Sequence, residues 1–208
     1  MPDGLKLGGG NGICQIGAMR NDIERVLIDE AVIEKRLDAM AVAIERDFPD
    51  GTLVVIILLK GALVFAADLL RRISRPLEIE CLNVASYHGG TRSSGQVDFL
   101  DRHFPEVRGR HVLLLDDILD TGLTLHAVGA RLREEGAAAV HAGVLLAKDK
   151  PRAVAVTVDY VGFEIGDEFV VGYGLDYQGK YRNLPFVGVL KAAAGSRSYI
   201  ADPGRPFL

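Results

Sequence analysis

The chain has little cysteine and no long apolar run. Its two cysteines, Cys14 and Cys81, are too few for a disulfide framework and lack the spacing of metal ligands, which favours a reduced, cytoplasmic protein. The longest aliphatic run, Leu53 to Leu59, is far shorter than the roughly 20 residues that a membrane span needs. The N-terminus has no basic segment followed by an apolar core, so we expect no signal peptide and no membrane partner.

An excess of basic residues is also lacking. Lys and Arg number 24 against 28 Asp and Glu, a formal net charge of −4. The chain therefore lacks the basic footprint that nucleic-acid-binding proteins carry, and we expect no nucleic-acid partner. An anionic ligand would have to be held by local groups, such as helix N-termini, backbone amides, a few placed cations or a metal ion.

Glycine is the residue in excess, at 24 of 208 residues, or about 11.5% against a usual 7% or so. Six of the 24 fall within residues 1–18, where neither a helical nor a strand period is visible. We therefore predict a flexible leader over 1–18, with Met19 as the start of the functional chain. One domain is expected over 19–191, followed by a tail over 192–208 to which the sequence assigns no role.

Buried strands alternate with helices through this domain. A helix is predicted after Asp29, where apolar residues recur at spacings of three and four. Further helices are predicted at 62–73 and 121–133, strands at 53–59, 77–81, 112–115 and 140–146, and a glycine-rich polar loop at 86–96. This order predicts an α/β domain with a parallel sheet between helices, and a ligand site beyond the carboxyl ends of the strands.

Residues 112–125, V-L-L-L-D-D-I-L-D-T-G-L-T-L, combine a buried strand with the start of a helix. The helix start offers free backbone N–H groups, a glycine that lets an anion approach, and two threonine hydroxyls, which together make a phosphate cradle. The three carboxylates can accept hydrogen bonds from sugar hydroxyls and attract Mg²⁺. The string therefore indicates a ribose 5-phosphate site. The alternative is three solvated acids beside a capped helix.

This string is similar to the phosphoribosyl diphosphate (PRPP) signature of type I phosphoribosyltransferases. The closer resemblance is to the hypoxanthine-guanine phosphoribosyltransferases and covers about residues 22–191. It is also carried by LLKGALVFAADLL at 58–70, SYHGGTRSSG at 86–95, and the stretch at 158–190 that contains VGFEIGDEFVVGYGLDY. It implies the type I phosphoribosyltransferase fold, a central parallel sheet flanked by helices with a small hood subdomain.

The implied reaction is the Mg²⁺-dependent transfer of ribose 5-phosphate from PRPP to a 6-oxopurine, with release of pyrophosphate. The resemblance also implies a homodimer or homotetramer. Asp116 and Asp117 would hold the ribose hydroxyls and, with Asp176, the metal, and Asp120 would be the general base. The 5-phosphate would be bound by Thr121, Gly122, Leu123 and Thr124. The pyrophosphate would be bound by Lys60 and Gly61, a dipeptide whose peptide bond is typically cis in the family, and by Arg182.

For the purine, the resemblance implies that Lys148 donates to the 6-oxo group, that Phe169 stacks on the ring, and that Val170 contacts its edge. The resemblance also assigns Asp176 to the purine side of the site. Ser86 and Tyr87 would close as a lid. From the residues alone, Lys148 could be a solvated lysine, Phe169 a core residue and the lid a surface loop.

Two other functions are weighed against this one. A PRPP-sensing, nucleic-acid-binding regulator of the same fold would need a basic face or an added domain, and the chain is acidic and short. Transfer to adenine, a pyrimidine or orotate is disfavoured by the purine-site stretch at 158–190.

Overall fold

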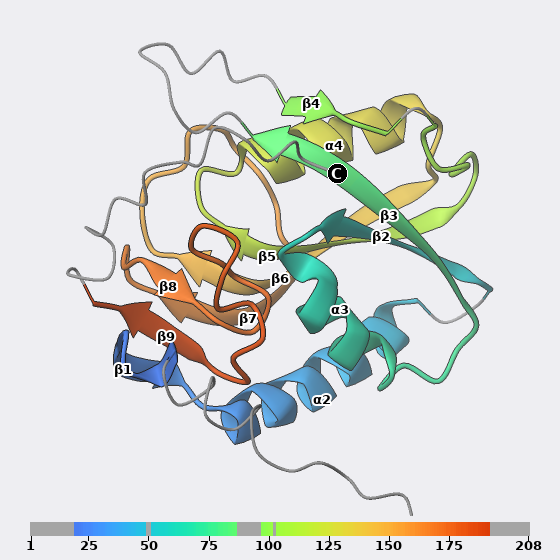
Figure 1. Ribbon diagram of the computed structural model, residues 1–208. Helices are drawn as coiled ribbons and strands as arrows, with labels where there is room; N and C mark the ends of the chain where they lie inside the picture. The colour runs from blue at the N-terminus through green and yellow to red at the C-terminus, as the bar shows by residue number, and fades with distance from the viewer. Residues whose placement is uncertain (1–18, 49–50, 87–96, 102, 192–208) are drawn as a thin grey trace, which may run out of the picture.

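The computed structural model describes residues 19–48, 51–86, 97–101 and 103–191. These residues form a six-stranded sheet in the order β4-β3-β2-β5-β6-β7 and a three-stranded sheet in the order β1-β9-β8 (Figure 1). The larger sheet consists of β2 (Leu53–Leu59), β3 (Leu77–Ser86), β4 (Val97–Phe99), β5 (His111–Leu119), β6 (Ala139–Lys148) and β7 (Tyr160–Ile165). Its strands are parallel except for the edge strand β4.

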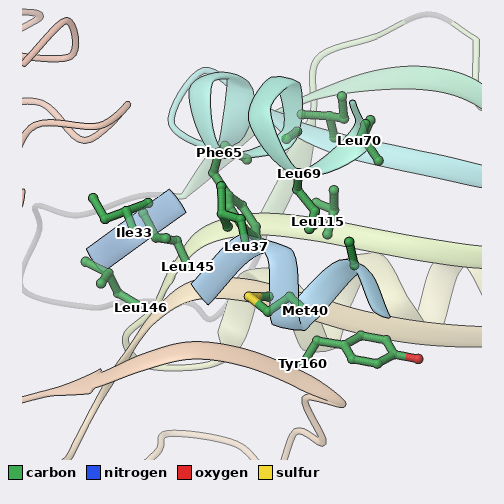
Figure 2. Packing of buried hydrophobic residues seen from close by; sticks show 14 of the residues in the cluster. Ile33, Leu37, Met40, Phe65, Leu69, Leu70, Leu115, Leu145, Leu146 and Tyr160 are labelled. Atoms are coloured by element: carbon green, nitrogen blue, oxygen red, sulfur yellow. The ribbon is translucent and has the colours of Figure 1, made fainter. Parts of the chain in front are cut away.

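Helices cover both faces of this sheet. α2 (Glu30–Asp47) and α3 (Ala62–Leu70) lie on one face, and α4 (Leu123–Glu134) lies on the other (Figure 1). β2 and β5 are buried on both sides, so their aliphatic residues alternate between two cores. Figure 2 shows the first core, where Leu37 of α2 meets Phe65 of α3 and Leu115 of β5.

The smaller sheet contains strands from both ends of the described chain. β1 (Ile23–Ile28) runs antiparallel to β9 (Val187–Leu190), which in turn runs antiparallel to β8 (Val170–Val171). This sheet stands beside the main one and corresponds to the predicted hood (Figure 1). The fold of the chain is the predicted α/β arrangement, with one antiparallel edge strand in the main sheet.

Several element boundaries differ from those predicted. β5 runs on to Leu119 and therefore contains Asp116 and Asp117, which were expected just after the strand. β6 ends at Lys148, two residues later than expected, and α3 ends at Leu70 rather than at residue 73. Pairing with the neighbouring strands explains the longer β5 and β6, because Asp116 pairs with Val144 and Leu119 with Ala147.

The leader, the tail and most of the lid loop lie outside the described residues, as does Tyr87. Ser86 is the last residue of β3. Among the helices of the described chain, none is long and apolar enough to cross a membrane.

Candidate active site

The carboxyl ends of β2 and β5 open into a cavity of about 320 Å³. Segments far apart in the chain build its wall: the end of β2, the end of β5 with the start of α4, and the segment between β8 and β9. The predicted site residues among its lining are Gly61, Asp116, Asp117, Asp120, Thr121, Gly122, Thr124, Asp176 and Arg182. The fold therefore brings together most of the residues that the sequence assigned to PRPP.

The turn into α4 depends on Gly122. Its φ of +83° is a left-handed conformation that favours glycine, and it takes the N-cap position of α4 without a side-chain cap. A Cβ there would lie 2.9 Å from Cγ1 of Val156. α4 begins at Leu123, two residues later than predicted, because the chain from Leu119 through Gly122 turns before the helix starts. The N–H of Leu123, the first of α4, donates to Oγ1 of Thr121 at 3.4 Å, and the start of the helix is a favourable place for an anion.

Arg152 holds the same turn through its backbone carbonyls, a role that the sequence did not predict. Its Nη1 donates to the carbonyl oxygens of Leu119 and Asp120, at 3.1 and 2.7 Å. The N–H of Ala153 donates to the carbonyl of Thr121 at 3.0 Å. The partners lie more than thirty residues apart, so no local pattern could reveal this role.

Replacing Arg152 by Ala should loosen the phosphate turn. Two hydrogen bonds from a charged donor are lost, each worth about 1.5–3 kcal/mol at most, and partial exposure reduces that figure. We expect the Kd for PRPP, measured by calorimetry, to rise about tenfold. Arg46→Ala, at an exposed arginine paired only with its neighbour Asp47, is the control and should leave the Kd unchanged. Equal Kd values for the two variants would contradict this role.

The Lys60–Gly61 turn lies against the acidic pair. A Cβ at Gly61 would stand 1.7 Å from Oδ2 of Asp117, so a larger residue would displace the Asp117 carboxylate. A Cβ at Gly174 would meet the carbonyl oxygen of Gly61 at 2.2 Å. The cis peptide bond joins Leu59 to Lys60, one bond before the expected position between Lys60 and Gly61. Lys60 itself is exposed and is not among the lining residues, so its contact with pyrophosphate stays a prediction.

Asp116 and Asp117 are neighbouring carboxylates in the floor of the cavity. Burial raises the pKa of Asp116 well above its ordinary value, and the charge of Asp117 raises it further. Burial also raises the pKa of Asp117, opposed by hydrogen bonds and by the charge of Arg182. This pair is costly to ionise in the free protein, which makes it a place where a cation is stabilising.

Asp176 and Arg182 close the cavity from the segment between β8 and β9. They form an ion pair at 2.6 Å, and Arg182 also donates to the carbonyl of Gly174 at 2.6 Å. The second oxygen of Asp176 accepts from the N–H of Gly179 at 2.7 Å. In the described part of the chain, no three carboxylate, histidine or cysteine side chains gather as a metal cluster. The assignment of Asp176 as a metal ligand therefore stays a prediction.

Lys148 and Asp120 define the other side of the site. Lys148 is 9% exposed, and its Nζ lies 3.4 Å from Oδ2 of Asp120 and 3.0 Å from Oδ1 of Asp167. A lysine so buried between two carboxylates is not a solvated surface lysine. Lys150 contacts the other oxygen of Asp120 and also lies 3.0 Å from Asp167. Neither Lys150 nor Asp167 was singled out from the sequence.

The aromatic candidate is positioned differently from a core residue. Phe169 is 54% exposed, and its ring lies nearly perpendicular to that of Tyr177, with ring centroids 5.5 Å apart. An exposure of this size leaves Phe169 accessible to a ligand. Val170 is buried in β8 and pairs with Val189 of β9. Phe169, Val170 and Lys148 are not among the lining residues of the 320 Å³ cavity. Lys148 is joined to that cavity through Asp120.

The mainly parallel sheet, the glycine-dependent anion turn and the acidic pair define a phosphoribosyltransferase. Residues 27–178 match the family described as the phosphoribosyl transferase domain. The hypoxanthine-guanine phosphoribosyltransferase of Staphylococcus epidermidis is 41% identical over 86% of this chain and all of its own length. The Bacillus subtilis enzyme of that name is 42% identical over 84% of this chain and 97% of its own length.

Solved structures agree with these sequence relatives. The crystal structure of a hypoxanthine phosphoribosyltransferase from Staphylococcus aureus has a TM-score of 0.82 at 38% identity, covering 86% of this chain and 97% of its own. The chain belongs to the hypoxanthine-guanine phosphoribosyltransferase family. The resemblance predicted from the sequence is thereby confirmed, and the chain is an enzyme rather than a regulator.

Proposed function

We propose that this enzyme transfers the 5-phosphoribosyl group of PRPP to hypoxanthine or guanine in purine salvage, forming IMP or GMP and pyrophosphate. The observation that carries the proposal is the junction at Asp120. Its backbone belongs to the phosphate turn, and its side chain pairs with the buried Lys148. One residue thus links an anion site to an ammonium suited to a 6-oxo group.

On the PRPP side, the turn at Thr121–Thr124 would bind the 5-phosphate through N–H groups and hydroxyls. Asp116 and Asp117 would accept hydrogen bonds from the ribose hydroxyls. Arg182 and Lys60, with the N–H of Gly61, would balance the pyrophosphate charge. These groups favour a transition state with positive charge on the sugar and negative charge on the leaving pyrophosphate.

On the purine side, the C1′–O bond to pyrophosphate breaks and a bond from C1′ to a ring nitrogen forms. The ammonium of Lys148 can only donate, which suits a 6-oxo group and leaves a 6-amino group unmatched. Asp120 would accept the proton of the five-membered ring. Phe169 would stack on the ring, and the lid at Ser86 and Tyr87 would exclude water.

Asp116 and Asp117 also fit a divalent cation, because adjacent carboxylates with raised pKa values are relieved by positive charge. We propose that they hold Mg²⁺ with the substrate, together with Asp176. When bound, Mg²⁺ would neutralise charge on the pyrophosphate.

The test is an incubation with PRPP, Mg²⁺ and, separately, hypoxanthine, guanine, xanthine, adenine and uracil. We expect nucleotide from hypoxanthine or guanine, and none when Mg²⁺ is removed by a chelator. The proposal would be refuted by nucleotide formed only from adenine or uracil. It would also be refuted if no nucleotide formed from any of the five bases.

Lys148→Gln should reduce discrimination by the 6-substituent, because an amide both donates and accepts. We expect the ratio of kcat/KM for hypoxanthine over adenine to fall about tenfold or more. Lys35→Gln, at an exposed lysine of α2, is the matched control. An unchanged ratio in the Lys148 variant would remove this residue from recognition of the base.

We further propose a homodimer or homotetramer in the cytoplasm. The oligomeric state is proposed from the resemblance to the hypoxanthine-guanine phosphoribosyltransferases. The thiol of Cys81 is free, which suits a reducing compartment. Light scattering measures the mass in solution, and a monomer would contradict the first proposal. Cell fractionation tests the proposed cytoplasmic location.

A further inference from the structure

Asp120 is held by two lysines rather than one. Lys148 faces its Oδ2 at 3.4 Å, and Lys150 contacts its Oδ1. Asp167, from the loop before β8, lies 3.0 Å from both ammonium groups through the same oxygen. The four side chains therefore form a closed ring of alternating charge.

Backbone geometry places both lysines on the same side. Lys148 is the last residue of β6, and the chain bends directly after it, where the N–H of Lys150 donates to the carbonyl oxygen of Lys148 at 3.1 Å. The N–H of Asp149 donates to the carbonyl of Ile165 at 2.8 Å, which anchors the chain between them to β7. The side chain of Lys150 is 24% exposed, so most of its length is covered by neighbouring residues.

The proposed reaction makes conflicting demands on Lys148. Its ammonium must donate to the 6-oxo group of the base, yet it also offsets the charge of Asp120. The Asp120 side chain is only 34% exposed, so a carboxylate without a cation there would be poorly compensated by water. The contact of Lys150 is on the other oxygen and does not compete with the base for Lys148.

We propose that Lys150 is a positioning residue that keeps Asp120 ionised and oriented while Lys148 turns to the purine. This inference rests on the proposed function. It divides two tasks between two lysines: one recognises the base, and the other serves as counter-ion of the proton acceptor.

The electrostatics of Asp120 support this division. Burial acts to raise the pKa of Asp120, but the hydrogen bond from Lys150 and the charges of Lys148 and Lys150 outweigh it and lower the pKa. The charged groups around this carboxylate are the two lysines and, beyond them, Asp167, while Arg152 reaches only the carbonyl oxygen. Asp116 and Asp117 line the same cavity from β5.

The test compares Lys150→Met with Lys150→Arg, and uses Lys35→Met on the exposed face of α2 as the matched control. In Lys150→Met, we expect the KM for hypoxanthine to rise about tenfold and the Kd for PRPP to stay within about twofold. The acid limb of the kcat/KM profile should move to higher pH, since the lysine that lowers the pKa of Asp120 is gone. Lys150→Arg should restore most of the activity, and Lys35→Met should match the wild type.

Direct titration of the Asp120 carboxyl by carbon-13 NMR separates this inference from the proposed function, because it needs no turnover. A raised pKa in Lys150→Met supports the inference even if the wild type forms no nucleotide, a result that would refute the proposed function alone. An unchanged pKa overturns the inference. An equal loss of affinity for both substrates, with a lowered Tm, also overturns it, because it indicates a merely structural lysine.

Discussion

Asp120→Asn should lower kcat for hypoxanthine by about 10²–10⁴-fold. Asn has nearly the same shape as Asp, but its amide cannot accept a proton at neutral pH. It also leaves Lys148 and Lys150 with Asp167 as their shared carboxylate partner. The backbone carbonyl that Arg152 holds is unchanged by the substitution, so the phosphate turn should persist.

The Kd for PRPP therefore separates chemistry from binding in this variant. We expect it to stay within about threefold of the wild-type value by calorimetry, because the 5-phosphate is bound by the turn rather than by the carboxylate. Asp167→Asn is the matched control: it removes a carboxylate from the same ring of charges but leaves Asp120 in place, and kcat should fall less than tenfold. A kcat near the wild-type value in Asp120→Asn would refute its role as proton acceptor.

The buried part of the fold was predictable because burial leaves a pattern in the sequence. The run at Leu53–Leu59 has aliphatic side chains for both faces of a sheet, and it forms β2 as expected. β1 at Ile23–Ile28 was missed because only its two ends are buried and its partner β9 lies about 160 residues further on. The sequence predicts that β5 ends at residue 115 because carboxylates are unusual in a central strand, but pairing with β6 outweighs that preference and extends the strand to Leu119.

The residues of the candidate site also fall into those that the sequence predicts and those that it does not. The contiguous string around Asp116 to Thr124 was readable because its parts follow one another in the chain. The roles of Lys150 and Arg152 could not be predicted from the sequence, because each contacts an atom of a residue about thirty positions away. A lysine two positions after another looks like a second solvated charge until β6 and β7 position it beside Asp120 and Asp167.

Asp116→Asn should stabilise the free protein while weakening its binding of PRPP with Mg²⁺ about 100-fold. The floor of the cavity holds Asp116 beside Asp117, and burial followed by the neighbouring charge raises the pKa of Asp116. A neutral amide of the same shape removes the repulsion. It also removes one of the two carboxylates proposed to hold the cation, and such an opposition between stability and function is common at active sites.

The pH dependence of this stabilisation has a definite sign. Because the pKa of Asp116 is higher in the folded than in the unfolded state, the folded protein binds more protons between the two values. The free energy of unfolding contributed by this group therefore decreases as pH rises from the ordinary carboxyl value, near 4, through the raised folded value. Asp116→Asn should raise Tm at pH 8 by about 3 °C or more, and the gain should shrink as pH falls toward 4.

Thermal unfolding with and without substrate completes the test. PRPP with Mg²⁺ should raise the Tm of the wild type through preferential binding to the folded state, and should raise that of Asp116→Asn much less. Asp38→Asn is the control, since its exposed carboxylate on α2 pairs with Arg72 at the surface, and it should respond to substrate like the wild type. If Asp116→Asn lowered Tm at pH 8, the carboxylate would be stabilising in the free protein, which would contradict a strained acidic pair that awaits a cation. If it left the substrate-induced rise in Tm intact, Asp116 would have no part in holding the ribose or the metal.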